Sequence, residues 1–300
     1  MSVLLMTVWL TGCVQEELGS TPSPAGNGIR FTLTVPDVNL PSVSSRTMTG
    51  AGTAKKEDEI ETVDILVFDA SKTPAVYLEW VTATGVTQDL ADNSTVSFSA
   101  KLPFTTASTC IVVVANRELD DIVSGFKKGV TTKVEAMEKM LHTQTGKWLA
   151  DGSTTGGYTR IPMYGEKVIN KITPSMEPIT GINMKRMLAR IDIHNNSVTS
   201  NFTVEEVYLA NYNTTGYIAP PWNTNGQVTE PAPDTPVLPA NSGKMTEEGD
   251  AILYSVKGNT PYDGEIYTFE SLAAEDAGGV GQDGEASRKD ATCLIVKGRI

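Results

Sequence analysis

The stretch IRFTLTVPDVNLPSVSSRTMTGAG, residues 29–52, begins with a β-strand pattern and ends as a loop. Apolar and polar side chains alternate at its start, which is typical of a strand buried on one face. The apolar positions are Ile29, Phe31, Leu33 and Val35. A small, polar segment follows, with one basic residue, Arg46, in its middle. Because that segment has no apolar anchors, it is suited to enter a protease cleft. The stretch therefore predicts a strand directly before a loop that can be cut.

Similar strand patterns recur along the chain, separated by turn residues and rich in β-branched and aromatic side chains. The clearest are ETVDILVFDA, CIVVVAN, MKRMLARIDIHN, FTVEEVYLANY and TCLIVKGRI, at residues 61–70, 110–116, 184–195, 202–212 and 292–300. One helix is predicted at residues 131–142, where Val134, Met137, Met140 and Leu141 share a face. Many short strands with one short helix predict an all-β fold built from β-sandwiches.

The length and composition indicate two ordinary globular domains. The chain has 300 residues, and the turn-rich segment INKITPSMEPITG, residues 169–181, lacks any strand or helix period. We therefore expect an N-terminal sandwich over residues 47–180 and a C-terminal one over 181–300. The net charge of −12 argues against nucleic acid as a partner, because phosphate binding needs clustered Lys and Arg.

The N-terminus has the pattern of a bacterial lipoprotein. Residues 1–12 contain a short apolar run that is too short to span a bilayer and fits a signal peptide. They lead into LTGC, which matches the lipobox and makes Cys13 the expected site of lipidation. Several acyl chains on one cysteine give a lasting anchor in a membrane, whereas a single chain binds only marginally. The polar, Pro- and Gly-rich residues after Cys13 indicate a tether.

The sequence carries no constellation that predicts catalysis, a metal or a cofactor. It has no G-x-S-x-G elbow and no Walker loop, and GVGQDG, residues 279–284, lacks the strand before it and the helix after it that a dinucleotide site requires. The acidic runs at residues 57–59 and 120–121 are expected to form solvated faces. We predict that the protein is not an enzyme.

The remaining cysteines and the two histidines are expected to be structural. Cys110 and Cys293 each lie at the start of an apolar run, which favours buried free thiols over a disulfide between them. His142 is predicted at the C-terminus of the helix and His194 at the end of a strand. Neither histidine is near a cysteine or carboxylate at metal-ligand spacing.

Several segments, taken in order, resemble the fimbrillins of type V pili. They are RFTLTVP, EDEIETVDILVFDA, CIVVVANRE, IPMYGE, MKRMLARIDIHN, VEEVYLANYNTTGYI, EIYTFES and CLIVKGRI, and they cover nearly the whole chain. The resemblance implies two tandem transthyretin-like β-sandwich domains, with one short helix in the first. It also implies an outer-membrane lipoprotein precursor of a Gram-negative bacterium, which matures into a cell-surface fimbrium and supports adhesion.

The resemblance further implies how such a precursor matures. In pilin members of the family, an arginine-specific surface protease cuts the loop after the first strand, and a strand from a neighbouring subunit fills the groove that is left. By position, the propeptide would be residues 13–46, with the lipid on Cys13, and the cut would lie between Arg46 and Thr47. Rival cut sites are Arg30, Lys55 and Lys56.

Two expectations depart from this simple picture. Family members continue well past a LIVKG strand, whereas the given sequence stops at Ile300, so we expect an incomplete second sandwich that lacks the donor strand. The chain could also be a tip or anchor subunit that keeps Cys13, or a glycan-binding surface lipoprotein. In the last case Trp80, Trp148 and Trp222 would supply stacking platforms.

Overall fold

The computed structural model describes ten segments of the chain, and its regular structure is almost entirely β. The described residues are 28–35, 58–89, 95–144, 146–148, 160–193, 201–221, 237–239, 251–255, 262–271 and 292–300. The helices are short, α1 (Asp120–Val123) and α2 (Lys133–Glu138). The strands are β1 (Ile29–Thr34), β2 (Val63–Asp69), β3 (Val76–Thr82), β4 (Thr84–Gln88), β5 (Thr95–Ala100), β6 (Thr109–Ala115), β7 (Leu141–Thr143), β8 (Met163–Ile169), β9 (Ile179–Asn183), β10 (Lys185–Arg186), β11 (Ala189–Ile193), β12 (Thr203–Ala210), β13 (Thr215–Tyr217), β14 (Ile252–Ser255), β15 (Tyr262–Thr268) and β16 (Cys293–Arg299).

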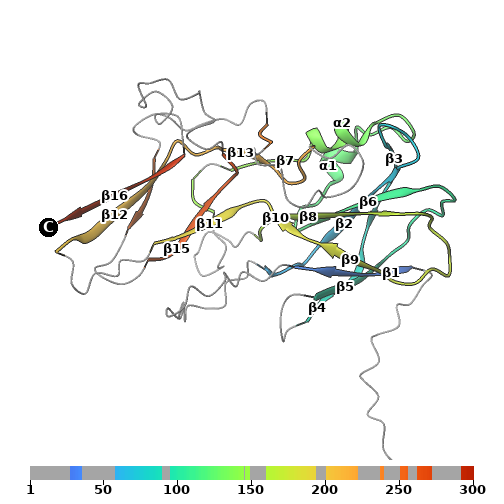
Figure 1. Ribbon diagram of the computed structural model, residues 1–300, viewed down its shortest axis with the longest axis horizontal. Helices are drawn as coiled ribbons and strands as arrows, with labels where there is room; N and C mark the ends of the chain where they lie inside the picture. Colours follow the sequence, from blue (N-terminus) through green and yellow to red (C-terminus); the bar gives the residue numbers. More distant parts are fainter. Residues whose placement is uncertain are drawn as a thin grey trace, which may run out of the picture.

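Two sheets form a sandwich from the first part of the chain. A five-stranded sheet has the order β10-β8-β6-β2-β3, and a four-stranded sheet has the order β4-β5-β1-β9. The chain passes from one sheet to the other through Ala83, between β3 and β4, and through Met184, between β9 and β10. Figure 1 shows the four-stranded sheet lying along one face of the five-stranded sheet, with both helices on the opposite face.

Strands β2 and β6, which are neighbours inside the larger sheet, are buried on both faces, which explains their apolar runs. Val67 of β2 and Val113 of β6 belong to the core between the sheets. Phe68 and Val112 belong to a second core, which lies on the face that the helices cover. The all-β sandwich fold that the sequence predicts is therefore confirmed.

The predicted helix is shorter than its sequence pattern. Helix α2 begins with a capping box between Thr132 and Glu135, and Met137 and Met140 are buried as predicted. The helix ends at Glu138, however, and Leu141 begins strand β7, which pairs with β13. The placement of His142 at a helix C-terminus is thus wrong, because His142 is the middle residue of β7.

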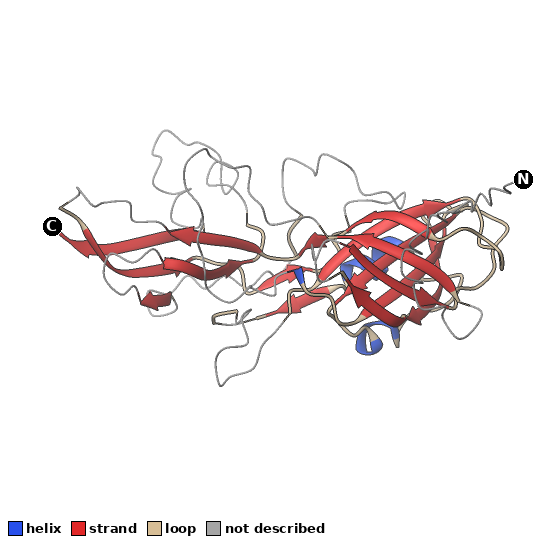
Figure 2. Ribbon diagram, turned by 90° about the horizontal axis from the view of Figure 1, so that it is seen from below, coloured by secondary structure: helices blue, strands red, loops and turns tan. Residues whose placement is uncertain are grey.

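The last part of the chain forms smaller sheets at the other end of an elongated molecule (Figure 2). Strands β11 and β15 pair with each other, and β14, β12 and β16 form a three-stranded sheet with its own small core. Cys293 is exposed, so its predicted burial is wrong, whereas Cys110 is buried as predicted, and neither forms a disulfide within the described residues. The reason is that β16 is an edge strand of the described sheet. Strand β11 ends at Ile193, so His194 lies outside the described residues.

The predicted division into two domains stays a prediction. Strand β9 runs across the expected boundary at residues 180 and 181, and β10 still pairs with β8 of the first sandwich. Residues from further along the chain also complete the core under the helices; they are Ile218, Ala219, Tyr267 and Phe269.

Candidate functional site

Strand β1 lies inside the four-stranded sheet, between β5 and β9. It runs antiparallel to β5, with all six of its residues in register, from Ile29 opposite Ala100 to Thr34 opposite Thr95. It runs parallel to β9, with a register shift between Phe31 and Leu33. At its end, Met184 N donates a hydrogen bond of 2.8 Å to the Thr34 carbonyl oxygen. Strand β1 therefore connects β5 and β9 within the sheet, because each of them pairs with it.

Every second side chain of this strand enters the core between the two sheets. The exposed fractions of Ile29, Phe31, Leu33 and Val35 are 7%, 1%, 0% and 1%. The intervening Arg30 and Thr34 point outward and are exposed. Full burial of one large apolar side chain is worth about 1.5–3 kcal/mol. This row thus contributes strongly to the first sandwich, as its alternating sequence pattern predicts.

The aromatic residue of the row has a specific partner in β5. The rings of Phe31 and Phe98 stack with centroids 4.9 Å apart and an angle of 7° between their planes. The two residues are also directly opposite each other in the strand register. Their stack closes the core on the side of β5, and sequence reasoning did not identify Phe98 as part of this site.

Loss of β1 would leave a groove with two kinds of unsatisfied surface. The facing edges of β5 and β9 would expose backbone N–H and C=O groups, because β1 pairs with both strands. The places of the four buried side chains of residues 29–35 would become apolar pockets. Such a groove is suited to the addition of an extended segment from another chain.

The chain is firmly anchored at Asp58, the first residue after Val35 that the structure describes. Asp58 forms an ion pair with Arg186, and Gln88 Nε2 donates a hydrogen bond of 2.7 Å to the Asp58 carbonyl oxygen. Ile60 is buried, and its backbone N–H donates to Gln88 Oε1 at 3.0 Å. These contacts come from β4 and β10, so they do not depend on β1 itself.

A second set of contacts holds the neighbouring acidic residues. Arg160 binds Glu59 and Glu61, with nitrogen–oxygen distances of 3.2 and 2.5 Å. Asn116 Nδ2 donates a hydrogen bond of 2.7 Å to the Glu59 carbonyl oxygen. The expectation that the acidic run forms a purely solvated face is therefore wrong for Asp58 and Glu59. Their arginine partners lie about a hundred or more residues away, and local spacing carries no signal for such pairs.

The predicted site residues divide into two groups. The strand residues Ile29, Phe31, Leu33 and Val35 lie together in the core. The predicted lipidation and cleavage residues are outside the described part of the chain, namely Cys13, Arg46 and Thr47, together with the rival sites Lys55 and Lys56. Among the rival sites, Arg30 lies within β1 and is opposite Ser99 of β5. A bond inside a paired strand is a poor protease substrate, because cleavage needs an extended, accessible segment.

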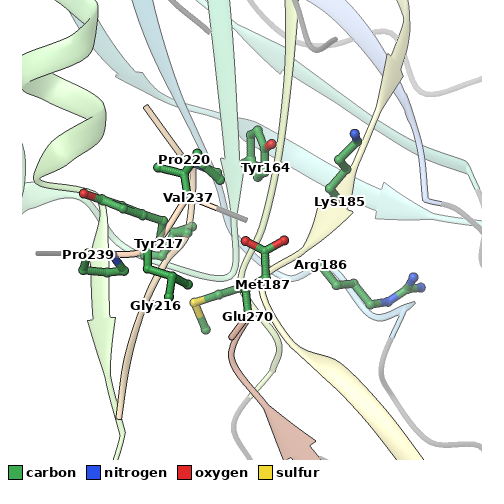
Figure 3. Close-up of a pocket in the computed structure, with 12 residues that line it drawn as sticks. Tyr164, Lys185, Arg186, Met187, Gly216, Tyr217, Pro220, Val237, Pro239 and Glu270 are labelled. Carbon is green, nitrogen blue, oxygen red and sulfur yellow. The ribbon is translucent and has the colours of Figure 1, made fainter. Parts of the chain in front are cut away.

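A small cleft lies where the first sandwich meets the later strands. It has a volume of about 80 Å³, and Tyr164, Met187, Tyr217, Pro239 and Glu270 are among its lining residues. In Figure 3 the Glu270 carboxylate points toward Tyr164, whereas the Arg186 guanidinium points away from the cleft. Partial desolvation raises the pKa of Glu270, although the residue is still exposed at the surface, and the positive charge of Lys185 opposes this rise. The cleft can take about one side chain, and its polar groups do not form a nucleophile–base pair.

The described residues offer little for other chemistry. They contain no cluster of His, Cys, Asp and Glu that could hold a metal ion, and no helix among them is long and apolar enough to cross a membrane. Burial raises the pKa of the Cys110 thiol to about 12, which makes it a poor nucleophile. Trp148 is 3% exposed and cannot stack on a sugar at the surface. Trp80 is half-buried, and Trp222 is outside the described residues.

Crystal structures with a similar chain path include three bacterial proteins. A candidate cell adhesion protein of Parabacteroides distasonis aligns with 91% of this chain and 75% of its own, at 16% identity and a TM-score of 0.48. A fimbrial assembly protein of the same species aligns with 90% and 85%, at 12% identity and a TM-score of 0.41. A candidate adhesin of Bacteroides ovatus aligns with 64% and 58%, at 13% identity and a TM-score of 0.30. Values this low say nothing about what the present chain does.

The sequence itself identifies the family. No curated protein matches it, but the family model described as major fimbrial subunit protein (FimA) matches residues 29–196. That match covers more than half of the 300 residues, and it begins at the first residue of β1. Membership implies a structural role in cell-surface fimbriae and association with other subunits. The chain therefore belongs to the major fimbrial subunit protein (FimA) family, as its resemblance to fimbrillins predicted.

Proposed function

We propose that this chain is a fimbrial subunit precursor whose first strand is a temporary occupant of its own sandwich. The precursor is exported as a lipoprotein on Cys13 and held at the outer membrane of a Gram-negative bacterium. An arginine-specific surface protease cuts between Arg46 and Thr47. Strand β1 then leaves with the lipid, and a strand from a neighbouring subunit takes its place, which links subunits into a fimbrium that supports adhesion.

One observation carries this proposal: β1 is an inner strand of its sheet and fills a complete row of core positions. A strand at the sheet edge could leave with little effect on its neighbours. Removal of an inner strand instead creates a groove that only another strand of similar pattern can fill. The two requirements of strand exchange, an open template and apolar pockets, are therefore combined at one place.

Contacts with strands of both sheets, β4 and β10, explain why only β1 would be lost. The segment that follows the loop is held at Asp58, Glu59 and Ile60 by contacts with Arg186, Arg160 and Gln88. None of these partners belongs to β1. A cut in the preceding loop thus detaches β1 and leaves β2 in place.

Cleavage also explains how a well-packed strand can leave at all. While the chain between Val35 and Asp58 is intact, the strand is tethered to its groove, and its effective concentration there is high, on the order of millimolar. After a cut, the strand becomes a separate ligand, and dilution or a competing strand can displace it. The strand that replaces β1 can then form the hydrogen bonds and apolar contacts by which β1 stabilises the precursor.

The direct test is treatment of the full-length protein with a trypsin-like, arginine-specific protease, followed by N-terminal sequencing. The proposal expects a new N-terminus at Thr47, loss of the 29–35 segment, and assembly with further subunits under the electron microscope. The variant Arg46→Ala should remain uncut, and Arg30→Ala serves as its matched control because it should be cut normally. Retention of β1 after cleavage would refute strand release.

A second candidate role is that of a tip or anchor subunit. This role shares the fold and the lipoprotein export but keeps β1 and the lipid. Protein isolated from cell-surface fimbriae and still beginning at a lipidated Cys13 would favour it over the stalk role.

A further inference from the structure

Strands β7 and β13 form a junction between the first sandwich and the later strands (Figure 1). His142 of β7 lies directly opposite Gly216 of β13. Backbone hydrogen bonds of 2.8 Å extend this pairing on both sides, from Ile218 N to the Met140 oxygen and from Gln144 N to the Thr214 oxygen. The junction is thus a short strand pair with His142 at its centre.

The His142 side chain lies among aromatic rings from two other segments. Its ring centroid is 5.1 Å from that of Trp148 and 6.3 Å from that of Phe269. Phe269 can come this close because Gly216 has no side chain: a Cβ atom there would lie 2.3 Å from Phe269 Cδ1. Trp148 and Phe269 are both buried in the core under the helices. His142 therefore connects β7, the 146–148 segment and the chain after β15.

This surrounding is unfavourable for a charged imidazole. His142 Nε2 is buried and has no hydrogen-bond partner among the residues that the structure describes, so a proton added there would be an unsatisfied buried donor as well as a buried charge. Gln144 provides a side-chain hydrogen bond to the ring, whereas Arg117 places a positive charge nearby. Arg117 itself pairs with Asp121 at 2.6 Å. The two facing rings, Trp148 and Phe269, do not titrate.

From this geometry we propose that His142 is a pH-sensitive latch of the junction. The neutral imidazole packs between the rings and holds β7 against β13. Mild acid favours arrangements in which His142 is out of the ring cluster and can be solvated, so the junction loosens. The inference goes beyond the proposed function and does not depend on strand release.

The direction of the pH effect follows from linkage. Burial, and then the charge of Arg117, lower the pKa of His142 in the folded protein. Above the ordinary pKa of about 6.5, the side chain is neutral in the folded and the open state, and the latch is fully effective. Below that value the open state takes up a proton first, so stability falls as the pH decreases from about 6.5 toward the folded-state pKa.

The chain contains two histidines, so substitution of one of them assigns the remaining histidine signal to the other. In the variant His194→Gln, the remaining histidine C2–H signal in NMR spectra belongs to His142, and His142 itself is unchanged. The proposal expects this signal to titrate with a midpoint below about 6.5. A midpoint at or above that value would overturn the latch.

A second measurement tests how protonation of His142 affects the stability of the protein. Urea unfolding of the full-length His194→Gln variant, measured at several pH values between about 7 and 5, should show a loss of stability as the pH decreases. The loss should be absent or much weaker in His142→Phe, which keeps a ring in the cluster but cannot be protonated. Equal pH dependence in both variants would refute the proposal, and if His142→Phe fails to fold, the NMR titration still decides.

Discussion

Phe31 and Phe98 stack almost parallel, at a centroid distance of 4.9 Å, across the pair of strands β1 and β5. This contact joins the strand that we propose is removed to one that stays. Substitution of Phe31 by Ala removes the stack and leaves a cavity in the core, so we expect a loss of about 3–5 kcal/mol in the free energy of unfolding. Urea denaturation measures this loss in the free energy of unfolding. Arg30→Ala, an exposed residue of the same strand, should change stability by about 0.5 kcal/mol or less.

The same contact predicts how the emptied groove discriminates between strands. After cleavage and removal of β1, a synthetic peptide of residues 28–36 should bind to the protein and compete with assembly. A peptide with Ala at the position of Phe31 loses the stack and most of one buried side chain, so its dissociation constant should rise by about a hundredfold or more. Isothermal titration measures both. Equal affinities would mean that the groove does not discriminate between Phe and Ala at the position of Phe31.

A buried ion pair fixes helix α2 on the larger sheet. Lys133 Nζ lies 2.8 Å from Glu166 Oε2, and the two side chains are 1% and 4% exposed. Removal of one partner leaves an uncompensated buried charge, so Lys133→Met should cost about 3–5 kcal/mol. The double variant Lys133→Met with Glu166→Leu should recover most of this loss, because no charge remains buried. Urea unfolding of the three proteins decides whether the pair acts as a unit.

The pH dependence of the same pair has a definite sign. Burial raises the pKa of Glu166, and the Lys133 charge opposes this rise. Because the pKa of Glu166 is higher in the folded than in the unfolded protein, its contribution to stability is present below the unfolded-state pKa of about 4.3. This contribution is lost as the pH rises through the folded-state pKa. Lys133→Met removes the opposing charge, so its stability should fall more steeply with rising pH than that of the unsubstituted protein. A parallel pair of curves would contradict this.

Sequence patterns predicted the parts of the fold that local burial determines. The alternation in β1 and the apolar runs in β2 and β6 each match the way those strands are buried. The end of α2 could not be predicted, because Leu141 leaves the helix to pair with Tyr217, which lies far along the chain. Cys293 lies in a run with the same apolar character as that of Cys110, yet its strand is at the edge of a small sheet.

The candidate site was predictable only in part for a similar reason. The strand pattern identified the row from Ile29 to Val35, since it depends on neighbours in sequence. The anchors Arg160 and Arg186, the stacking partner Phe98 and the ring cluster around His142 depend on contacts between distant segments. Such contacts follow from strand order, which no local period specifies.

The close approach of Phe269 to Gly216 predicts a sensitive position in the junction. A Cβ atom at Gly216 would lie 2.3 Å from Phe269 Cδ1, so Gly216→Ala must displace the ring from the core and should cost about 1–3 kcal/mol. Thermal unfolding measures the change. Gly125→Ala is a matched control, because the nearest atom to its Cβ is the flexible end of Lys139 at 3.9 Å, and it should be neutral or slightly stabilising.

The two cysteines in the described residues should differ sharply in reactivity. Thiol reagents react with the thiolate, so both accessibility and pKa control the rate. Cys293 is exposed, whereas Cys110 is fully buried and its pKa is raised to about 12. In the folded protein at pH 8, iodoacetamide should therefore label Cys293 within minutes and leave Cys110 unmodified, as peptide mass spectrometry can show. In denaturant both should react at similar rates. Rapid labelling of Cys110 under native conditions would mean that β6 opens without global unfolding, which its position at the centre of the five-stranded sheet argues against.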